Sequence, residues 1–276
     1  MAKIFEKEQN SIVIDLFFTN KEDMVLETAE EYNKLAILYK SKKLSNKVIE
    51  VYKKALKIRE SSLGFIHRKT AESYNNLAQA YFKVDMSYEA KSLYKKALEI
   101  REKIFGIGHK ETASIYANLA DIYFKENNIK EASILYRKAL HIRLNTIGES
   151  HLDTASSYHD LAYFYASQYA FEEALELFKK SLNIRKKIYD SNNITLAESY
   201  NHLALCYYHL FKYQEAFETL KKAINIENKI YPKDSEMLLL SKRNLREIKK
   251  KLVKDDNSIY IKIKRYIFNT ILKIYV

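Results

Sequence analysis

One pattern recurs in this sequence every 42 residues. The pentapeptide YNNLA at residues 74–78 returns as YANLA, YHDLA and YNHLA at that interval, and YNKLA precedes it by the same interval. Five units therefore begin at the alanines Ala29, Ala71, Ala113, Ala155 and Ala197. A fixed period of this length is typical of solenoid proteins, in which each unit buries its apolar surface by stacking on the next. We expect a stack of five like units.

Each unit carries the apolar spacing of two helices. Numbered from its alanine, every unit has Tyr at position 4, Leu at 7, Ala at 8 and Tyr at 11. Steps of three and four residues place these side chains on one face of an α-helix. Positions 20, 24, 27, 28 and 30 repeat apolar and small residues at similar steps, which predicts a second, longer helix. Glycine at position 36 (Gly64, Gly106 and Gly148) is expected to end it, and Asp190 replaces glycine in the fourth unit.

This arrangement resembles the tetratricopeptide repeat, and its 42-residue length with the linker G-x-x-H-x-x-T-A at residues 106–113 is similar to the repeat of kinesin light chains. The resemblance implies an all-α superhelix of five helix pairs, with units at residues 29–70, 71–112, 113–154, 155–196 and 197–238. The family often has glycine at position 15, between the two helices. Here the resemblance predicts that turn less strongly in the fourth and fifth units, which carry Tyr169 and Phe211.

Composition narrows the class further. The chain has only four glycines and one proline, too few to punctuate a typical β-rich fold. A single cysteine, Cys206, excludes an intramolecular disulfide and fits a reducing compartment. We see no signal peptide and no apolar stretch long enough to span a membrane, so we expect a cytoplasmic protein. The net charge of +12 comes from residues 29–70 and 239–276, whereas residues 71–238 are balanced, so we expect no nucleic acid partner.

In tetratricopeptide arrays the first helix of each pair lines a concave face. Positions 2, 5, 9, 12 and 13 commonly point into that face, and position 6 can reach it. The resemblance therefore implies a peptide-binding groove formed by the following residues: Asn33, Lys34, Asn75, Asn76, Gln79, Phe82, Lys83, Asn118, Asp121, Lys125, His159, Tyr163, Asn201 and His202.

The amides that recur within the pentapeptides suggest how such a groove could bind. An asparagine side chain both donates and accepts hydrogen bonds, so a row of them can bind an extended peptide backbone of any sequence. We hypothesise that Asn33, Asn75, Asn76, Asn118 and Asn201 form this row. The alternative is that these amides bond only to water or to the neighbouring helix.

The resemblance also suggests a ligand chemistry. Kinesin light chains imply peptides with an aromatic residue flanked by acids, and Lys83 and Lys125 beside Phe82 and Phe124 could provide charge and stacking. The lysine clamp of chaperone-binding members is absent, because position 2 carries Glu or Ser in every unit.

The sequence contains no residue pattern typical of a metal site or a catalytic site. His67, His109 and His151 recur one per unit, so they lie too far apart to share an ion; we expect them to help start the next helix, with Thr70, Thr112 and Thr154 as possible caps. The pair of His159 and His202 lacks a companion cysteine. No phosphate loop, nucleophile elbow or H-E-x-x-H motif occurs. We therefore expect no cofactor, no metal and no enzymatic activity.

The two ends differ from the units. Residues 1–28 are expected to hold a short capping helix near residues 11–18, and residues 239–252 a solvated capping helix. Residues 253–276 form a basic amphipathic tail, with a wide apolar side over residues 259–276. Three interpretations stay open for this tail: a helix folded back over the array, a contact with a second copy or another protein, or binding to an anionic membrane surface.

These observations lead to one prediction of function. We expect a non-catalytic protein–protein interaction scaffold that binds an extended peptide in its groove. The alternative is a membrane-peripheral adaptor that uses the C-terminal tail.

Overall fold

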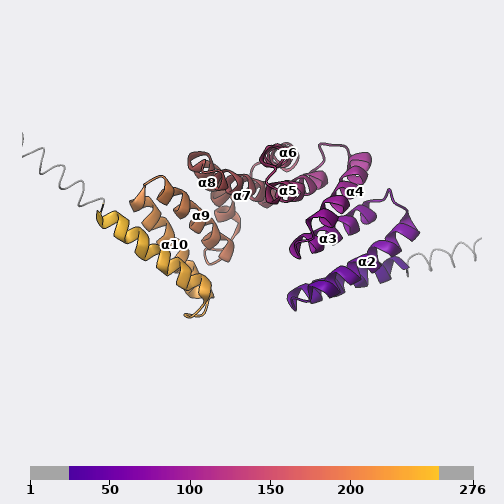
Figure 1. Cartoon of the computed structure of the whole chain (residues 1–276), viewed down its shortest axis with the longest axis horizontal. Coiled ribbons are helices and arrows are strands. Elements are labelled where there is room, and N and C mark those ends of the chain that lie inside the picture. The colour runs from indigo at the N-terminus through magenta and orange to yellow at the C-terminus, as the bar shows by residue number, and fades with distance from the viewer. Residues whose placement is uncertain (1–24, 255–276) are drawn as a thin grey trace, which may run out of the picture. The chain divides into compact units, whose positions relative to one another are not determined.

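The computed structural model describes residues 25–254, and this part of the chain contains helices and no strand (Figure 1). A first helix spans residues 25–41 and a terminal helix spans residues 236–254. Between them lie α2 (Ser45–Leu63), α3 (Arg68–Lys83), α4 (Ser87–Phe105), α5 (Lys110–Lys125), α6 (Ile129–Ile147), α7 (Leu152–Ser167), α8 (Phe171–Ile188), α9 (Ile194–His209) and α10 (Tyr213–Ile230). The predicted all-α fold of consecutive helix pairs is confirmed.

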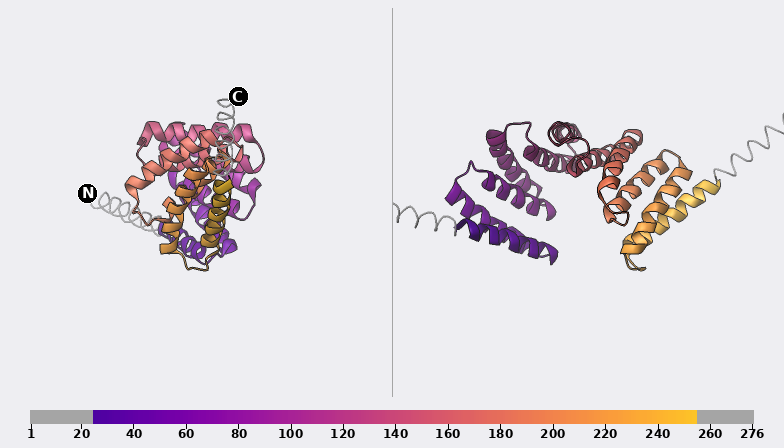
Figure 2. Two further views of the ribbon diagram at one scale, coloured as in Figure 1. Left: turned by 90° about the vertical axis from the view of Figure 1, so that its left-hand side faces the viewer. Right: turned by 180° about the vertical axis from the view of Figure 1, so that it is seen from behind.

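The chain divides into two compact units, each of which contains several of the 42-residue repeats. The one that ends at Ile142 is called the first unit from here on, and the one that begins at Arg143 is called the second unit. Within the first unit α3 packs against α2, α4 and α5, and within the second α7 packs on α8, and α9 on α8 and α10 (Figures 1 and 2). Within each of the two units, these helices therefore contact their neighbours along the chain. This is the neighbour-to-neighbour packing that a repeat sequence predicts.

The repeated apolar positions form the core of each unit. Tyr74, Leu77 and Ala78 of α3 are almost fully buried and pack with Ala90 and Tyr94 of α4. In the second unit Leu203 and Ala204 of α9 join Phe178 of α8 and Leu220 of α10 in one cluster. The small alanines allow two helices to approach closely, and the large rings fill the space on either side of the contact. Pattern and packing agree at these positions.

The turn between the two helices of a pair has the same backbone conformation in all five 42-residue repeats. Position 15 has a positive φ in every one: Lys43 (57°), Asp85 (64°), Asn127 (59°), Tyr169 (61°) and Phe211 (60°). The amide of the next residue donates to the carbonyl of position 11, as in Lys212 N to Tyr207 O at 2.9 Å. This six-to-one bond belongs to the Schellman motif, which glycine usually completes. Tyr169 and Phe211 adopt the left-handed conformation although they are bulky.

The linker between pairs confirms one expectation and corrects another. His67, His109 and His151 do start the next helix, because each Nδ1 accepts from the backbone amide two residues later. Asn193 does the same in the fourth linker. The threonines were the wrong choice of cap. Thr70 lies inside the first turn of α3, fully buried, and its hydroxyl donates to the carbonyl of Gly64 at 2.9 Å, which closes the linker.

The side chain at position 31 of each 42-residue repeat forms a buried polar contact with the next repeat. The position holds arginine four times, in Arg59, Arg101, Arg143 and Arg185, and each is at most 9% exposed. Three of them donate to a serine fourteen residues later, with distances of 2.7 to 2.8 Å. The fifth repeat has Glu227 at this position. Its side chain is 1% exposed, and its carboxylate accepts a hydrogen bond from the hydroxyl of Ser241 at 3.1 Å.

The terminal helix covers the end of the second unit. Leu238 and Ile248 are buried in the same cluster as Leu203 and Leu220, so one side of this helix packs as a first helix would. Residues 1–24 and 255–276, with the predicted short N-terminal helix and most of the predicted amphipathic tail, lie outside the described residues. Among residues 25–254, no helix combines the length and the apolar content that crossing a membrane requires.

Candidate functional site

The predicted groove residues fall into two sets, one in each unit. Ten of them lie on the first helix, α3 and α5 of the first unit, and four lie on α7 and α9 of the second. Lys34, Lys83, Lys125 and Tyr163 are exposed, and the other ten are partly exposed. No predicted groove residue is fully buried, and each set can be described by itself.

The amides of the first unit interact with one another. Asn118 of α5 donates from Nδ2 to Oδ1 of Asn75 on α3, at 3.4 Å, which joins two neighbouring first helices. Asn76 and Gln79 are partly exposed beside them on α3. The Oδ1 atom of Asn33 is buried without a donor among residues 25–254. Bonding to the neighbouring helix therefore accounts for Asn75 and Asn118, and binding of a peptide backbone by this row stays a prediction.

Most of the charged groove residues of the first unit have partners within the chain. Lys34 pairs with Glu31 at 2.6 Å. The ammonium group of Lys125 pairs with Asp85 of the preceding 42-residue repeat and lies 5.5 Å from the centre of the Phe82 ring. The carboxylate of Asp121 accepts from the hydroxyl of Tyr136 on α6. Lys34 and Lys125 therefore each have a carboxylate beside them, which reduces the positive potential available to an acidic ligand.

In the second unit two histidines replace this amide pair. Nε2 of His159 on α7 lies 3.2 Å from Nδ1 of His202 on α9. The His202 ring stacks on Phe178, with centroids 5.2 Å apart, and Tyr163 meets its edge at 6.0 Å. Burial lowers the pKa of His202 to about 4, with smaller contributions from His159 and Arg185. The His202 ring is therefore neutral at pH 7.

A first pocket lies between α7 and α9. Its volume is about 400 Å³. Aromatic side chains dominate its lining: Tyr163 from α7, Phe171 and Phe178 from α8, and His202 and His209 from α9. The ring of His209 stacks flat on Phe171 at 4.3 Å. This pocket has the character of a site for an apolar or aromatic side chain.

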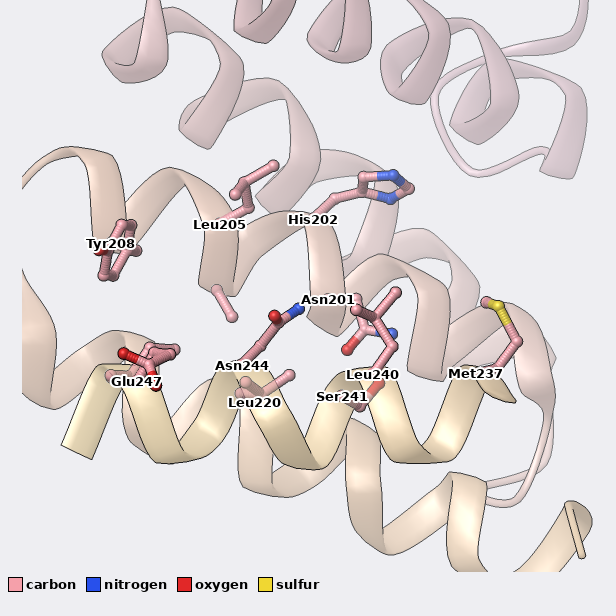
Figure 3. A pocket seen from close by; sticks show the side chains of 12 residues that line it. Asn201, His202, Leu205, Tyr208, Leu220, Met237, Leu240, Ser241, Asn244 and Glu247 are labelled. Carbon is pink, nitrogen blue, oxygen red and sulfur yellow. The ribbon is translucent and has the colours of Figure 1, made fainter. Parts of the chain in front are cut away.

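A second pocket, of about 380 Å³, lies on the other side of α9, against the terminal helix (Figure 3). His202 and Leu205 line both pockets, so the two flank one helix. In Figure 3, Tyr208 and Glu247 stand at one end, and His202 and Met237 at the other. Leu205 is 48% exposed and contributes apolar surface to both pockets.

The groove predicted from the sequence includes only Asn201 and His202 of this second pocket and none of the residues that the terminal helix contributes. Leu240, Ser241, Asn244 and Glu247 line it from the terminal helix. These residues stand at positions 2, 3, 6 and 9 of what would be a sixth unit, and positions 2, 6 and 9 are among those that the family uses. The predicted solvated cap at residues 239–252 therefore also keeps the register of a first helix and contributes to a pocket.

Asn201 connects this pocket to the buried Glu227. Its Nδ2 donates to Oε1 of Glu227 at 2.8 Å, and Ser241 donates to the same oxygen. The other carboxylate oxygen of Glu227 and the Oδ1 of Asn201 are both buried, and neither has a donor among the described residues. The floor of the pocket therefore has an acidic group directly behind it.

Cys206 does not belong to either pocket. It is fully buried in the core of the second unit, and burial raises the pKa of its thiol to about 12. A thiol in that state is a poor nucleophile at neutral pH. Within residues 25–254 no group of three or more histidine, cysteine or acidic side chains is arranged to hold a metal ion.

Comparison with known families identifies the repeat. The tetratricopeptide repeat model matches residues 69–145, 135–187 and 153–229, and a second tetratricopeptide repeat model matches residues 29–62. No curated protein sequence matches the chain.

Solved structures agree with this. BtubC (BKLC) from P. vanneervenii is 24% identical with a TM-score of 0.65, over 77% of this chain and 85% of that one. Two structures of a Podosopora anserina protein, named as a kinesin light chain with nearly identical TPR-like repeats, are each 25% identical. Their TM-scores are 0.61 and 0.59; the matches cover 72% and 75% of this chain, and 94% and 97% of those chains. The 42-residue repeat is thus of the kinesin-light-chain type.

Proposed function

The chain belongs to the tetratricopeptide repeat family, and from this premise we propose that it binds an extended segment of a partner protein along the first helices of its pairs. The family provides protein–protein interaction scaffolds, and its members are generally not enzymes. The proposal adds a place and a kind of ligand to that general role. It concerns the second unit first, since the open pockets described above are there.

The observation that carries the proposal is the pair of pockets on either side of α9. Together they offer an aromatic pocket between α7 and α9 and a mixed apolar and polar pocket between α9 and the terminal helix. Leu205, which lines both pockets, is 48% exposed, and Tyr163, which lines the aromatic pocket, is 51% exposed. A peptide crossing α9 would cover both side chains and place one of its own in each pocket. Burial of such anchors is the usual source of affinity in helical grooves.

The amide row is a secondary element of the proposal. Asn201 is engaged with Glu227, and Asn75 with Asn118, so these amides have only part of their hydrogen-bonding capacity left for a ligand. Asn76 and Gln79 are the groove amides best placed to bind a peptide backbone in the first unit, because both are partly exposed and neither side chain is hydrogen-bonded within residues 25–254. The preference for acidic peptides is weakened by the pairing of Lys125 with Asp85, which leaves Lys83 as its main support.

The membrane-peripheral alternative and the contact with a second copy both depend on residues 259–276, which lie outside the described part of the chain. They keep a simple test of their own. A tail that binds membrane would make the full-length chain sediment with anionic vesicles at low salt, and failure to sediment would exclude that role.

Binding of random peptides displayed on phage tests the proposal directly. We expect wild-type protein to enrich a related set of peptides, and Leu205→Glu to weaken their binding at least tenfold, because a carboxylate then stands between both pockets. Ile188→Glu is the matched control: Ile188 ends α8 and is 47% exposed, but it lines neither pocket. Absence of any enriched peptide, or equal binding by Leu205→Glu, would refute the proposed groove.

A further inference from the structure

The fifth 42-residue repeat carries an acidic side chain at a buried position where the other four repeats carry a basic one. The four preceding units have an arginine at position 31, and in Arg59, Arg143 and Arg185 its guanidinium donates to a serine of the next unit. In the fifth repeat Glu227 replaces the arginine. The serine is still present as Ser241, and its hydroxyl donates to the Glu227 carboxylate. The contact between helices is kept, while the cation of the earlier units is lost.

Among residues 25–254, no cationic side chain forms an ion pair with Glu227. Its Oε1 accepts from the neutral groups of Asn201 and Ser241, and its Oε2 is buried without a donor in the described chain. Asn201 leaves a second buried acceptor, its Oδ1, next to it. A buried carboxylate is costly unless it is paired and hydrogen-bonded. Two adjacent acceptors without donors are suited to a group that carries several N–H donors and a positive charge.

These acceptors lie behind the pocket between α9 and the terminal helix. Asn201 and Ser241, the two side chains that contact Glu227, both line that pocket (Figure 3). Leu205, Leu220 and Leu240 provide an apolar wall. An arginine or lysine side chain has the matching form, with an apolar stem and a cationic end.

The charges around the pocket favour the same ligand. Among its twelve lining residues the only charged one is Glu247, at the end near Tyr208. Glu247 pairs with Lys250 at 2.7 Å, but that pair is exposed and so contributes little. The basic residues Lys242, Arg243 and Arg246 of the terminal helix do not line the pocket. The pocket is therefore acidic on a strongly basic helix.

We propose that this pocket binds an arginine side chain of a partner's peptide segment, whose guanidinium occupies the place of the missing cation beside Glu227 and Asn201. This inference rests on the proposed function, because the arginine arrives on the peptide that crosses α9. Arginine suits the site better than lysine, since its planar group can donate to Glu227 and Asn201 together. The other pocket, between α7 and α9, would receive an apolar or aromatic residue of the same segment.

A double-mutant cycle between ligand and protein tests this. Peptides are first selected on the wild-type protein from the random library, and we expect an arginine to be enriched at one position. The best peptide is then synthesised with that arginine and with citrulline, its neutral analogue of the same shape. On wild-type protein, citrulline should weaken binding ten- to a hundredfold. On Glu227→Gln, the two peptides should bind within about twofold of each other.

Two further variants separate the possible outcomes. Glu227→Arg restores the arginine of the other units and should abolish the preference by filling the site from within, while circular dichroism reports that the helices remain folded. Glu247→Gln removes the exposed carboxylate of the pocket and should leave most of the citrulline effect in place. An arginine preference that persists in Glu227→Gln, or selected peptides without any basic residue, would overturn this inference and leave the proposed groove standing. Failure to select any peptide would overturn both.

Discussion

Nε2 of His159 lies 3.2 Å from Nδ1 of His202, across two neighbouring first helices and 43 residues apart in sequence. Asn75 and Asn118 stand at the equivalent positions of the first unit and are also joined by a hydrogen bond. The repeat thus uses one geometric position for two chemistries. In the first unit the contact joins two neutral amides, whereas in the second it includes His202, whose pKa is lowered by burial.

The histidine pair predicts a pH-dependent stability. The pKa of His202 falls from its ordinary 6.5 to about 4, chiefly because burial removes its hydration. The unfolded chain therefore binds more protons than the folded one between pH 6.5 and pH 4, so the free energy of unfolding decreases as the pH falls through that range. The loss is at most roughly 3 kcal/mol. Urea denaturation at a series of pH values measures it.

The protein itself suggests the matched variants for that experiment. His159→Asn with His202→Asn copies the amide pair of the first unit and should flatten the pH dependence between pH 6.5 and 4. His151→Asn is the control, because Asn193 performs the same capping role in the next linker, and the slope should be unchanged. Equal slopes in the double variant and the wild type would show that the lowered pKa of His202 does not cause the pH dependence.

The capping histidines predict a second stability effect. Nδ1 of His109 accepts from the amide of Glu111 at 3.2 Å, which satisfies one of the free donors at the start of α5. His109→Ala should destabilise the protein by about 1 kcal/mol, whereas His109→Asn should stay close to wild type. Urea denaturation at pH 7.5 compares the three proteins. A loss as large for asparagine as for alanine would mean that stacking of His109 on Phe105, at 4.5 Å, matters more than the cap.

The left-handed turn residues predict a stabilising substitution. Phe211 has a φ of 60° and is 75% exposed, so its side chain contributes little packing while its backbone is strained. Phe211→Gly should stabilise the chain by about 0.5 to 1 kcal/mol, because relief of strain exceeds the entropic cost of glycine. Thermal denaturation detects this as a rise of a few degrees. Phe211→Ala keeps the strain and should not stabilise; an equal rise for alanine would contradict the explanation.

The buried arginines predict a large cost for a small change. Ser199 accepts from Nη1 of Arg185 at 2.7 Å in the core. Ser199→Ala leaves this buried donor without that acceptor and should cost about 1 to 3 kcal/mol of folding free energy. Ser156→Ala is the comparison, since the Ser156 hydroxyl bonds only to the carbonyl of Leu152 in its own helix, and it should cost less than about 0.5 kcal/mol. Equal effects of the two substitutions would show that the arginine contact is not important for stability.

Much of the fold was predictable because the repeat displays each core position five times. The helix pairs follow from the tyrosine, leucine and alanine positions, and the histidine of the linker does begin the next helix. The left-handed turn at Tyr169 and Phe211 was not predictable from their own residue types. It is imposed by the packing of the two helices on either side, which fixes the turn whatever residue occupies it.

The site was predictable only in part. The register placed Tyr163, Asn201 and His202 on the exposed face of first helices, but it could not show that His202 is largely buried against Phe178. The buried arginines carried a clear signal, an arginine at position 31 in four units and a glutamate in the fifth. That signal is hard to interpret from sequence alone, because a charge on an amphipathic helix is usually solvated, and here the partner serine lies in the following unit.

Hydrogen exchange in the presence of a selected peptide tests the central claim most directly, namely that the inner faces of first helices in the second unit receive a partner. With the peptide bound, we predict the largest slowing of exchange in α7, in α9 and in residues 236–254, and smaller changes in α8 and α10, which contribute only Phe171, Phe178 and Leu220 to the two pockets. Protection confined to α8 and α10, or to residues outside the second unit, would contradict it.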